Sequence, residues 1–205
     1  GSHGGGGGGR GGSGSGRRGI TGSTTSTGTG NRVYQNGVEG NWVNFDSANH
    51  GWYFDLGSGK RIKGTWADIA YNYDGKTKIY SYHFNADGVM DSGWWKNDQG
   101  VWYHLSTIHD GWFGSMDKGW YRDSADGSWY YLNLLTGSMQ TGWQELGGKW
   151  YYFAPTASAE TYEYDAVSER WYYKDNATVR PYGSMYRNEV TPDGYRVDAT
   201  GAWVR

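Results

Sequence analysis

Residues 119–139 read Gly-Trp-Tyr-Arg-Asp-Ser-Ala-Asp-Gly-Ser-Trp-Tyr-Tyr-Leu-Asn-Leu-Leu-Thr-Gly-Ser-Met, and this stretch decides the fold of the chain. A short aromatic segment opens it, an Asp-Gly pair follows, and a second aromatic segment returns. Two such segments joined by a turn in which glycine can take a positive φ predict a β-hairpin. Thr-Gly-Ser then ends the returning strand before Met139.

The same pattern recurs at a fixed spacing along the chain. Trp120 and Trp143 open successive copies 23 residues apart, and Trp129, Trp150 and Trp171 follow one another at intervals of 21 residues. A fixed period of this length indicates an array of one small structural unit. Because an isolated hairpin is at best marginally stable in water, we expect the hairpins to stack on their neighbours. The predicted fold is all-β, a solenoid of stacked β-hairpin repeats.

The ends of the chain depart from this pattern. Residues 1–30 contain 15 glycines, almost no apolar residues, and a Gly-Ser-His start that is typical of a cleaved affinity tag. Such a segment cannot bury enough surface to offset its ordering entropy, so 1–30 is interpreted as a tag scar and flexible linker. Residues 31–205 are expected to form one repeat domain, in which 191–203 is read as a closing hairpin.

Composition excludes several classes of function. The net charge of −2 argues against nucleic-acid binding, and no apolar stretch is long enough to span a membrane. The chain has no cysteine, and its five histidines lack the spacing of a zinc site, so neither a metal nor a cofactor is expected. Nor does a Gly-x-Ser-x-Gly motif suggest a catalytic serine. Aromatic residues are the unusual feature, with 13 Trp and 19 Tyr.

A Gly-Trp pair, a turn, a Trp-Tyr-Tyr strand and a Gly-x-Met segment, repeated together, resemble the choline-binding, or cell-wall-binding, repeats of Gram-positive surface proteins. The resemblance covers roughly residues 40–205 and is strongest over 93–173. It implies a non-enzymatic, extracellular and cell-wall-associated module whose partner is a choline-decorated polymer, the teichoic acid of the wall. It also implies that each choline lies in a cage of aromatic rings between successive repeats.

Carried onto this chain, the resemblance implies three cages, each with two aromatics from one hairpin and a third from the next. The first is Trp120, Trp129 and Tyr152, with Met139 between the repeats; the second is Trp143, Trp150 and Tyr173; the third is Trp94, Trp102 and Tyr131, with Met116. An earlier set, Trp66, Ser81 and His104, is expected to be incompetent because Ser and His replace two aromatic residues.

The chemistry suits a quaternary ammonium group, because the faces of aromatic rings attract the cation and shield its methyl groups. Two other interpretations stay open. The same rings can stack on sugars, which favours a glycan-binding module, or they can stack only on one another. An enzyme would need a catalytic domain, which the glycine-rich start suggests has been removed upstream. The sequence leaves the oligomeric state open.

Overall fold

The computed structural model describes residues 32–34, 39–73, 75–125, 127–156, 162–165, 167, 170–173 and 180–205. The expected linker at 1–30 lies outside the described residues. The described chain divides into two compact units, which we call the N-terminal unit, up to Asp117, and the C-terminal unit, from Lys118 to Arg205.

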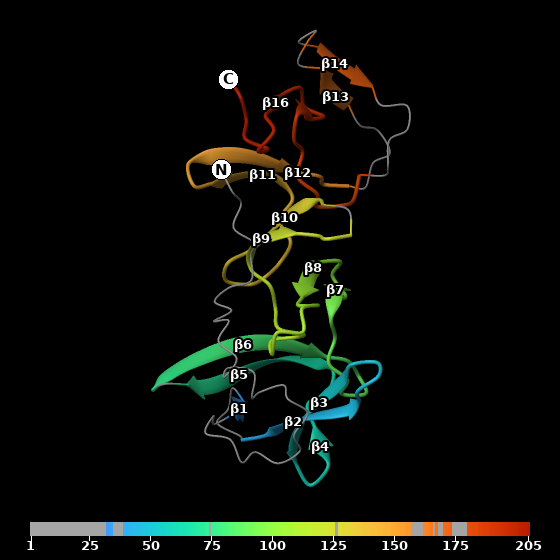
Figure 1. Ribbon diagram of the computed structural model, residues 1–205, viewed down its shortest axis with the longest axis vertical. Coiled ribbons are helices and arrows are strands. Elements are labelled where there is room, and N and C mark those ends of the chain that lie inside the picture. The colour runs from blue at the N-terminus through green and yellow to red at the C-terminus, as the bar shows by residue number, and fades with distance from the viewer. Residues whose placement is uncertain are drawn as a thin grey trace. The chain divides into compact units, whose positions relative to one another are not determined.

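Every regular element in the described ranges is a β-strand, and each strand pairs antiparallel with its partner. Figure 1 shows the elements of both units. Those of the N-terminal unit are β1 (Arg32–Tyr34), β2 (Asn41–Asp46), β3 (Gly51–Gly57), β4 (Lys60–Arg61), β5 (Thr65–Tyr73), β6 (Lys76–Phe84), β7 (Gly93–Lys96) and β8 (Trp102–Leu105). They form the sheets β1-β5-β6, β2-β3-β4 and β7-β8.

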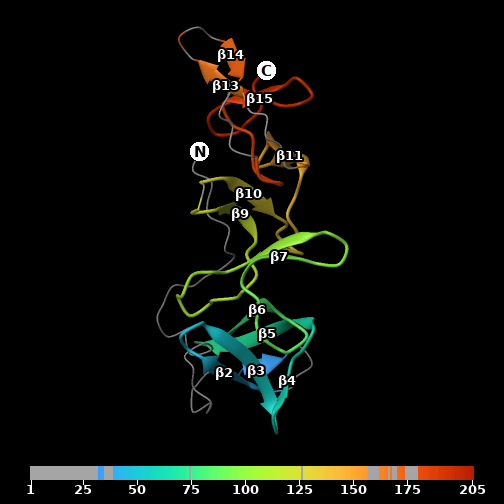
Figure 2. The ribbon, with the colours of Figure 1, turned by 90° about the vertical axis from the view of Figure 1, so that its right-hand side faces the viewer.

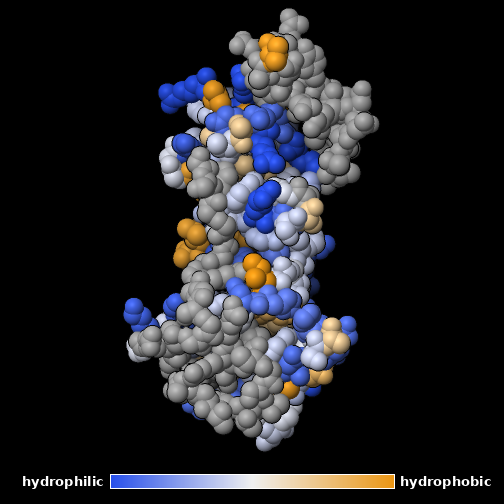
Figure 3. All heavy atoms as spheres, viewed as in Figure 1, coloured by the Kyte–Doolittle hydropathy of each residue, from blue (hydrophilic) through white to orange (hydrophobic). Residues whose placement is uncertain are grey.

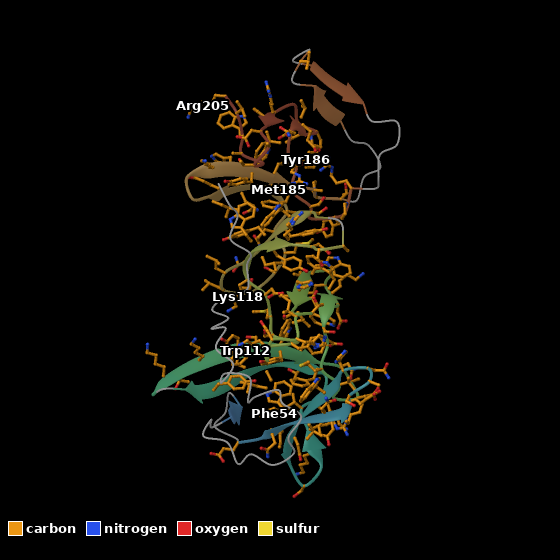
Figure 4. All side chains as sticks on the ribbon, viewed as in Figure 1. Phe54, Trp112, Lys118, Met185, Tyr186 and Arg205 are labelled. Carbon is orange, nitrogen blue, oxygen red and sulfur yellow. The ribbon has the colours of Figure 1, made fainter. Side chains whose placement is uncertain are left out.

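Aromatic side chains fill the core of the N-terminal unit, between the β2-β3-β4 sheet and the long β5-β6 hairpin (Figure 2). Trp42 is buried there, and its indole nitrogen donates a 2.8 Å hydrogen bond to the hydroxyl of Tyr71. Trp112, labelled with Phe54 in Figure 4, stacks on Tyr80 with ring centroids 4.3 Å apart. The rings therefore supply the apolar surface that aliphatic residues provide in most domains.

The C-terminal unit contains β9 (Gly119–Arg122), β10 (Trp129–Leu132), β11 (Gly142–Leu146), β12 (Lys149–Phe153), β13 (Tyr162–Asp165), β14 (Arg170–Tyr173), β15 (Glu189–Val190) and β16 (Arg196–Val197). These strands pair in chain order as four hairpins. The stretch 119–139 forms β9 and β10, as its sequence predicts, with Trp120 opposite Tyr131.

Methionine and glycine tie each hairpin to the next. The backbone of Met139 bridges to Leu132, and that of Met185 bridges to Phe153, at the end of each returning strand. Met185 also donates its N–H to the carbonyl of Trp129 in the preceding hairpin, at 2.8 Å. Its side chain packs among buried residues of the β12 hairpin, and Figure 4 labels its position. The Met segment therefore fastens consecutive hairpins together.

Gly183 shows why a glycine precedes methionine in this motif. Its φ of +84° suits glycine, and a Cβ added there would collide with the side chain of Met139 from the preceding repeat. Gly201 has the same relationship to Met185. The motif thus serves packing between repeats.

The prediction of an all-β fold built from stacked hairpins is confirmed, because successive hairpins stack within each unit. The upstream repeats differ from the simple copies that the sequence suggested, since β5 and β6 are nine residues long and each takes part in a three-stranded sheet. In the described ranges no helix has the length and hydrophobicity needed to cross a membrane.

Candidate functional site

The C-terminal unit contains an open pocket of about 380 Å³ lined almost entirely by aromatic side chains. Its lining residues are Trp143, Trp150, Asp193, Tyr195 and Trp203. Trp150, Tyr195 and Trp203 are 43%, 49% and 36% exposed, unusually high values for such large apolar rings. Solvent therefore reaches the faces of the rings, and so can a ligand.

The β11-β12 hairpin supplies two of these walls. Trp143 pairs with Tyr152 across the ladder, and Trp150 lies two residues before Tyr152 on the same strand. Side chains on a strand alternate between faces, so all three lie on one face of the hairpin. Trp143 contacts the ring of Tyr152 at 5.1 Å between ring centroids and packs against the buried cluster to which Tyr152 and Tyr186 belong.

The closing segment, 189–205, supplies the other walls. The backbone N–H of Trp203 donates a 2.8 Å hydrogen bond to the backbone carbonyl of Trp150, which fixes Trp203 beside the hairpin. The ring of Tyr195 stands nearly perpendicular to both neighbouring indoles, at 87° and 5.8 Å from Trp143 and at 79° and 6.3 Å from Trp203. Because adjacent rings are nearly perpendicular, the lining has the form of an open box. A ligand inside it would meet ring faces and edges from more than one direction.

Asp193 adds a carboxylate to this box. The indole nitrogen of Trp143 donates to its Oδ2 at 2.8 Å, and the hydroxyl of Thr191 donates to its Oδ1 at 2.5 Å. Burial raises the pKa of Asp193, but these two hydrogen bonds outweigh burial, and the net pKa lies below the ordinary value. Asp193 is therefore ionised at neutral pH.

One cation of the chain already lies near the pocket. The guanidinium carbon of Arg205 is 5.7 Å from the centroid of the Trp203 ring. Arg205 is not among the residues that line the pocket. Its position shows that the Trp203 ring is placed to contact a cation, as the quadrupole of an indole favours.

An open box of ring faces with one carboxylate can hold a compact cation that has few hydrogen bonds to offer. Such a cation is attracted by the quadrupoles of the rings. Because the pocket is open, the cation keeps part of its hydration, and the free-energy cost of desolvation is small. A sugar could also stack one apolar face on a single indole.

The second predicted cage corresponds most closely to this pocket. Trp143 and Trp150 lie together, as expected. The side chain of Tyr173 lies outside what the structure describes, although the backbone of Tyr173 pairs with Tyr162 in β14. Sequence reasoning missed Asp193, Tyr195 and Trp203 and treated them as parts of a closing hairpin. The aromatic residues Tyr195 and Trp203, in an otherwise mostly polar closing segment, were the available signal.

In the first predicted cage, Tyr151 occupies the place that the sequence assigned to Tyr152. Trp120 lies 6.3 Å from Trp129 and 4.9 Å from Tyr151, measured between ring centroids. Tyr152 instead lies 5.1 Å from Trp143. Strand alternation explains the change, because neighbouring residues of β12 face opposite sides and only the odd-numbered tyrosine faces the preceding hairpin.

Met139 is the methionine of the first predicted cage, and its place beside Trp120 and Trp129 remains a prediction. It packs against Gly183, whereas Met185 lies in the cluster to which both tryptophans contribute. A binding role for Trp120 and Trp129 remains a prediction.

The third predicted cage draws its residues from both units. Trp94, Trp102 and Met116 belong to the N-terminal unit, and Tyr131 belongs to the C-terminal unit. Trp94 lies 4.9 Å from the ring of His104, and the amine of Lys96 lies 5.6 Å from the ring of Trp102. The complete set remains a prediction.

The expectation that the set Trp66, Ser81 and His104 is incompetent remains a prediction, and each member has other polar or aromatic partners in the structure. The Ser81 hydroxyl donates to Asp68 at 2.5 Å, and His104 hydrogen-bonds Asp117 at 2.7 Å. Trp66 instead lies 5.1 Å from His83.

His83 itself lies in a cluster of aromatic rings. It stacks on Trp95 at 3.8 Å and hydrogen-bonds Asp91 at 2.6 Å. Within the described ranges, no three His, Cys, Asp or Glu residues converge as a metal site.

Comparison with known proteins agrees with the sequence resemblance. The family described as "Putative cell wall binding repeat" matches residues 118–134 and 141–156. These stretches contain the β9-β10 and β11-β12 hairpins. The resemblance predicted from the sequence is confirmed for these repeats. No curated protein matches the chain.

Several solved structures are similar to the chain. Choline binding protein F from Streptococcus pneumoniae is 29% identical, with a TM-score of 0.42 over 80% of this chain and 57% of that one. CbpJ from Streptococcus pneumoniae TIGR4 is 28% identical, with a TM-score of 0.42 over 80% and 47%. The modular Cpl-1 endolysin, complexed with a peptidoglycan analogue, is 24% identical, with a TM-score of 0.42 over 78% and 41%. This chain therefore corresponds to about half the length of these proteins.

Proposed function

We propose that this chain, two of whose hairpins are cell-wall-binding repeats of the choline-binding type, is a non-catalytic attachment module. Its ligand is the choline group of a cell-wall polymer such as teichoic acid, and it acts outside the cell at the wall. The observation that carries the proposal is the pocket in which Trp143, Trp150, Tyr195 and Trp203 surround a space suited to a small cation.

The size and chemistry of the pocket fit a trimethylated nitrogen. A quaternary ammonium cannot donate a hydrogen bond, so it is recognised through charge and apolar contact alone. Each ring contact contributes about 0.5–2 kcal/mol, depending on how much water is excluded. Several contacts, less the cost of immobilising the ligand, correspond to about −4 to −6 kcal/mol and a Kd nearer millimolar than nanomolar.

Weak single sites are consistent with attachment to a polymer. A wall polymer presents the same group many times, so a second engaged site benefits from the high local concentration of ligand created by the first. The repeated aromatic pattern at Trp120 and Trp129, and at Trp94 and Trp102, offers further positions of the same chemical kind. We expect attachment to depend on more than one repeat.

A glycan-binding module is the alternative function. The exposed indole of Trp150 supports it, since a flat accessible ring can stack on the apolar face of a sugar. The box geometry and its carboxylate favour a cation over a sugar, because a sugar would use one wall and leave the perpendicular rings unoccupied.

Retention on a quaternary-amine resin, followed by elution with free choline, tests the proposal. We expect the intact chain to be retained and choline to release it at millimolar concentration. The matched comparison is elution with the neutral isostere 3,3-dimethylbutan-1-ol, which should release it less well. Retention that choline fails to reverse, together with glycan-array binding that choline does not compete, would establish the glycan alternative instead.

A further inference from the structure

Several turns in the described ranges are held by an Asn or Asp at their first position. Asn85, Asn97, Asn133 and Asp198 each accept the backbone N–H of the residue two positions later through a side-chain oxygen. This is the ordinary structural role of Asn and Asp in turns. The hydrogen bonds of Asp193 differ from those of these residues.

In the turn 191–195 that role belongs to Thr191. The Thr191 hydroxyl accepts the backbone N–H of Tyr195 at 3.1 Å, and the Thr191 backbone N–H donates to the Tyr195 carbonyl at 2.7 Å. Asp193 therefore does not occupy the first position of the turn, although its Oδ1 accepts from the Thr191 hydroxyl. Its carboxylate accepts from Trp143, on a hairpin 50 residues earlier, and lies in the wall of the pocket.

We propose that Asp193 is a specificity-determining residue, a fixed negative charge that makes the pocket select positively charged guests over neutral guests of the same shape. This inference rests on the proposed function and deepens it. The aromatic walls alone attract a cation but also accept a neutral tert-butyl group through apolar contact. A carboxylate in the wall adds a Coulomb attraction that acts on the charged guest and not on the neutral one.

The carboxylate is positioned for this role by its two donors. Trp143 and Thr191 satisfy one oxygen each, and neither donor carries a charge, so the negative charge of Asp193 stays uncompensated. Other charged residues adjacent to the lining residues include Arg205 over Trp203, Glu145 opposite Trp150 in the ladder, Lys149 directly before Trp150, and Arg196 directly after Tyr195. Of these charged residues, Asp193 is the one that lines the pocket.

The test compares choline with 3,3-dimethylbutan-1-ol on the wild-type chain and on Asp193→Asn. Asparagine keeps the size of the side chain and an oxygen that can accept from Trp143, and it removes the charge. Binding is followed through the indole N–H resonances of Trp150 and Trp203, assigned with Trp→Phe variants, so that only this pocket is observed. Asp198→Asn is the matched control, since it makes the same change in a neighbouring turn whose Asp does not line the pocket.

We expect Asp193→Asn to weaken choline binding about two- to fivefold, the range of a partly exposed charge pair. The affinity for the neutral isostere should stay the same, and Asp198→Asn should change neither. An unchanged ratio of the two affinities in Asp193→Asn, or an equal loss for both ligands, overturns the role of Asp193 and leaves the proposed function standing. Failure of the wild-type pocket to bind choline overturns the proposed function itself, and this inference with it.

Discussion

The indole nitrogen of Trp143 donates a 2.8 Å hydrogen bond to the carboxylate of Asp193, joining residues 50 positions apart in the chain. The bond links the β11-β12 hairpin to the closing turn and brings the two halves of the aromatic pocket together. It also stabilises the charged form of the carboxylate. This one hydrogen bond therefore holds the two parts of the pocket lining together and favours the ionised form of Asp193.

Trp143→Phe should raise the pKa of Asp193 toward its ordinary value. The phenyl ring still packs on Tyr152, but the indole donor that lowers the pKa is lost. The measurement is an NMR titration of the Asp193 carboxyl between pH 2 and 6. Asp198 provides the internal reference, because Trp143 is not among the groups that shift its pKa. An unchanged Asp193 titration would show that the hydrogen bond does not stabilise the ionised form.

Trp203→Ala should weaken choline binding by about 2- to 30-fold, which corresponds to one ring contact of about 0.5–2 kcal/mol. Stability should change little, because Trp203 is 36% exposed. Isothermal titration with choline and urea unfolding measure the two effects. Phe45→Ala is the control, since Phe45 is an exposed aromatic, 49% accessible, in the other unit. Equal choline affinities in both variants would remove Trp203 from the site.

Choline affinity should be constant between pH 5 and 8. Asp193 has a lowered pKa, because the hydrogen bonds to its carboxylate outweigh burial, so its charge is lost only as pH falls through that pKa, below the range tested. Burial and nearby groups raise the pKa of Tyr152, which therefore stays neutral. The four histidines that the structure describes, His50, His83, His104 and His109, belong to the N-terminal unit. Choline titrations at four pH values test this, and a midpoint between 5 and 8 would contradict the assignment of the pocket.

Gly183→Ala should destabilise the C-terminal unit by about 2–4 kcal/mol. Alanine is strained at a φ of +84°, and its methyl group would displace Met139 from the stack. Gly147→Ala is the matched control: it has a φ of +60° and nothing within 4 Å of the added Cβ, so strain alone should cost about 1 kcal/mol. Urea unfolding of both variants separates the two contributions. Similar losses would mean that contact with Met139 contributes nothing.

Trp120 should be coupled energetically to Tyr151 and not to Tyr152. Edge-to-face rings at 4.9 Å predict a coupling of about 0.5–1.5 kcal/mol in a double-mutant cycle of unfolding free energies. The cycle of Trp120→Ala with Tyr152→Ala is the control and should be additive within about 0.5 kcal/mol. A larger coupling to Tyr152 would restore the pairing expected from the sequence.

The repeated hairpin is visible in the sequence because its signals are local. An Asp-Gly turn between two aromatic segments, as in residues 119–132, specifies a hairpin without help from distant residues, and the period of about 21 residues indicates stacking. The partners of the rings were less predictable. Assigning Tyr152 to Trp120 required knowing which face of β12 meets the preceding hairpin, and a shift of one residue reverses that face.

Turn chemistry and strand composition are local signals that recur at a fixed period, so the sequence alone predicts an array of aromatic β-hairpins, two of which match the cell-wall-binding repeat. Only the tertiary structure decided which rings share a pocket. Asp193, Tyr195 and Trp203 lie on the closing segment, 40 or more residues after Trp150, and they reach Trp143 and Trp150 only because the chain folds back onto the β11-β12 hairpin. A contact of that kind depends on how hairpins stack, and local sequence patterns do not encode it.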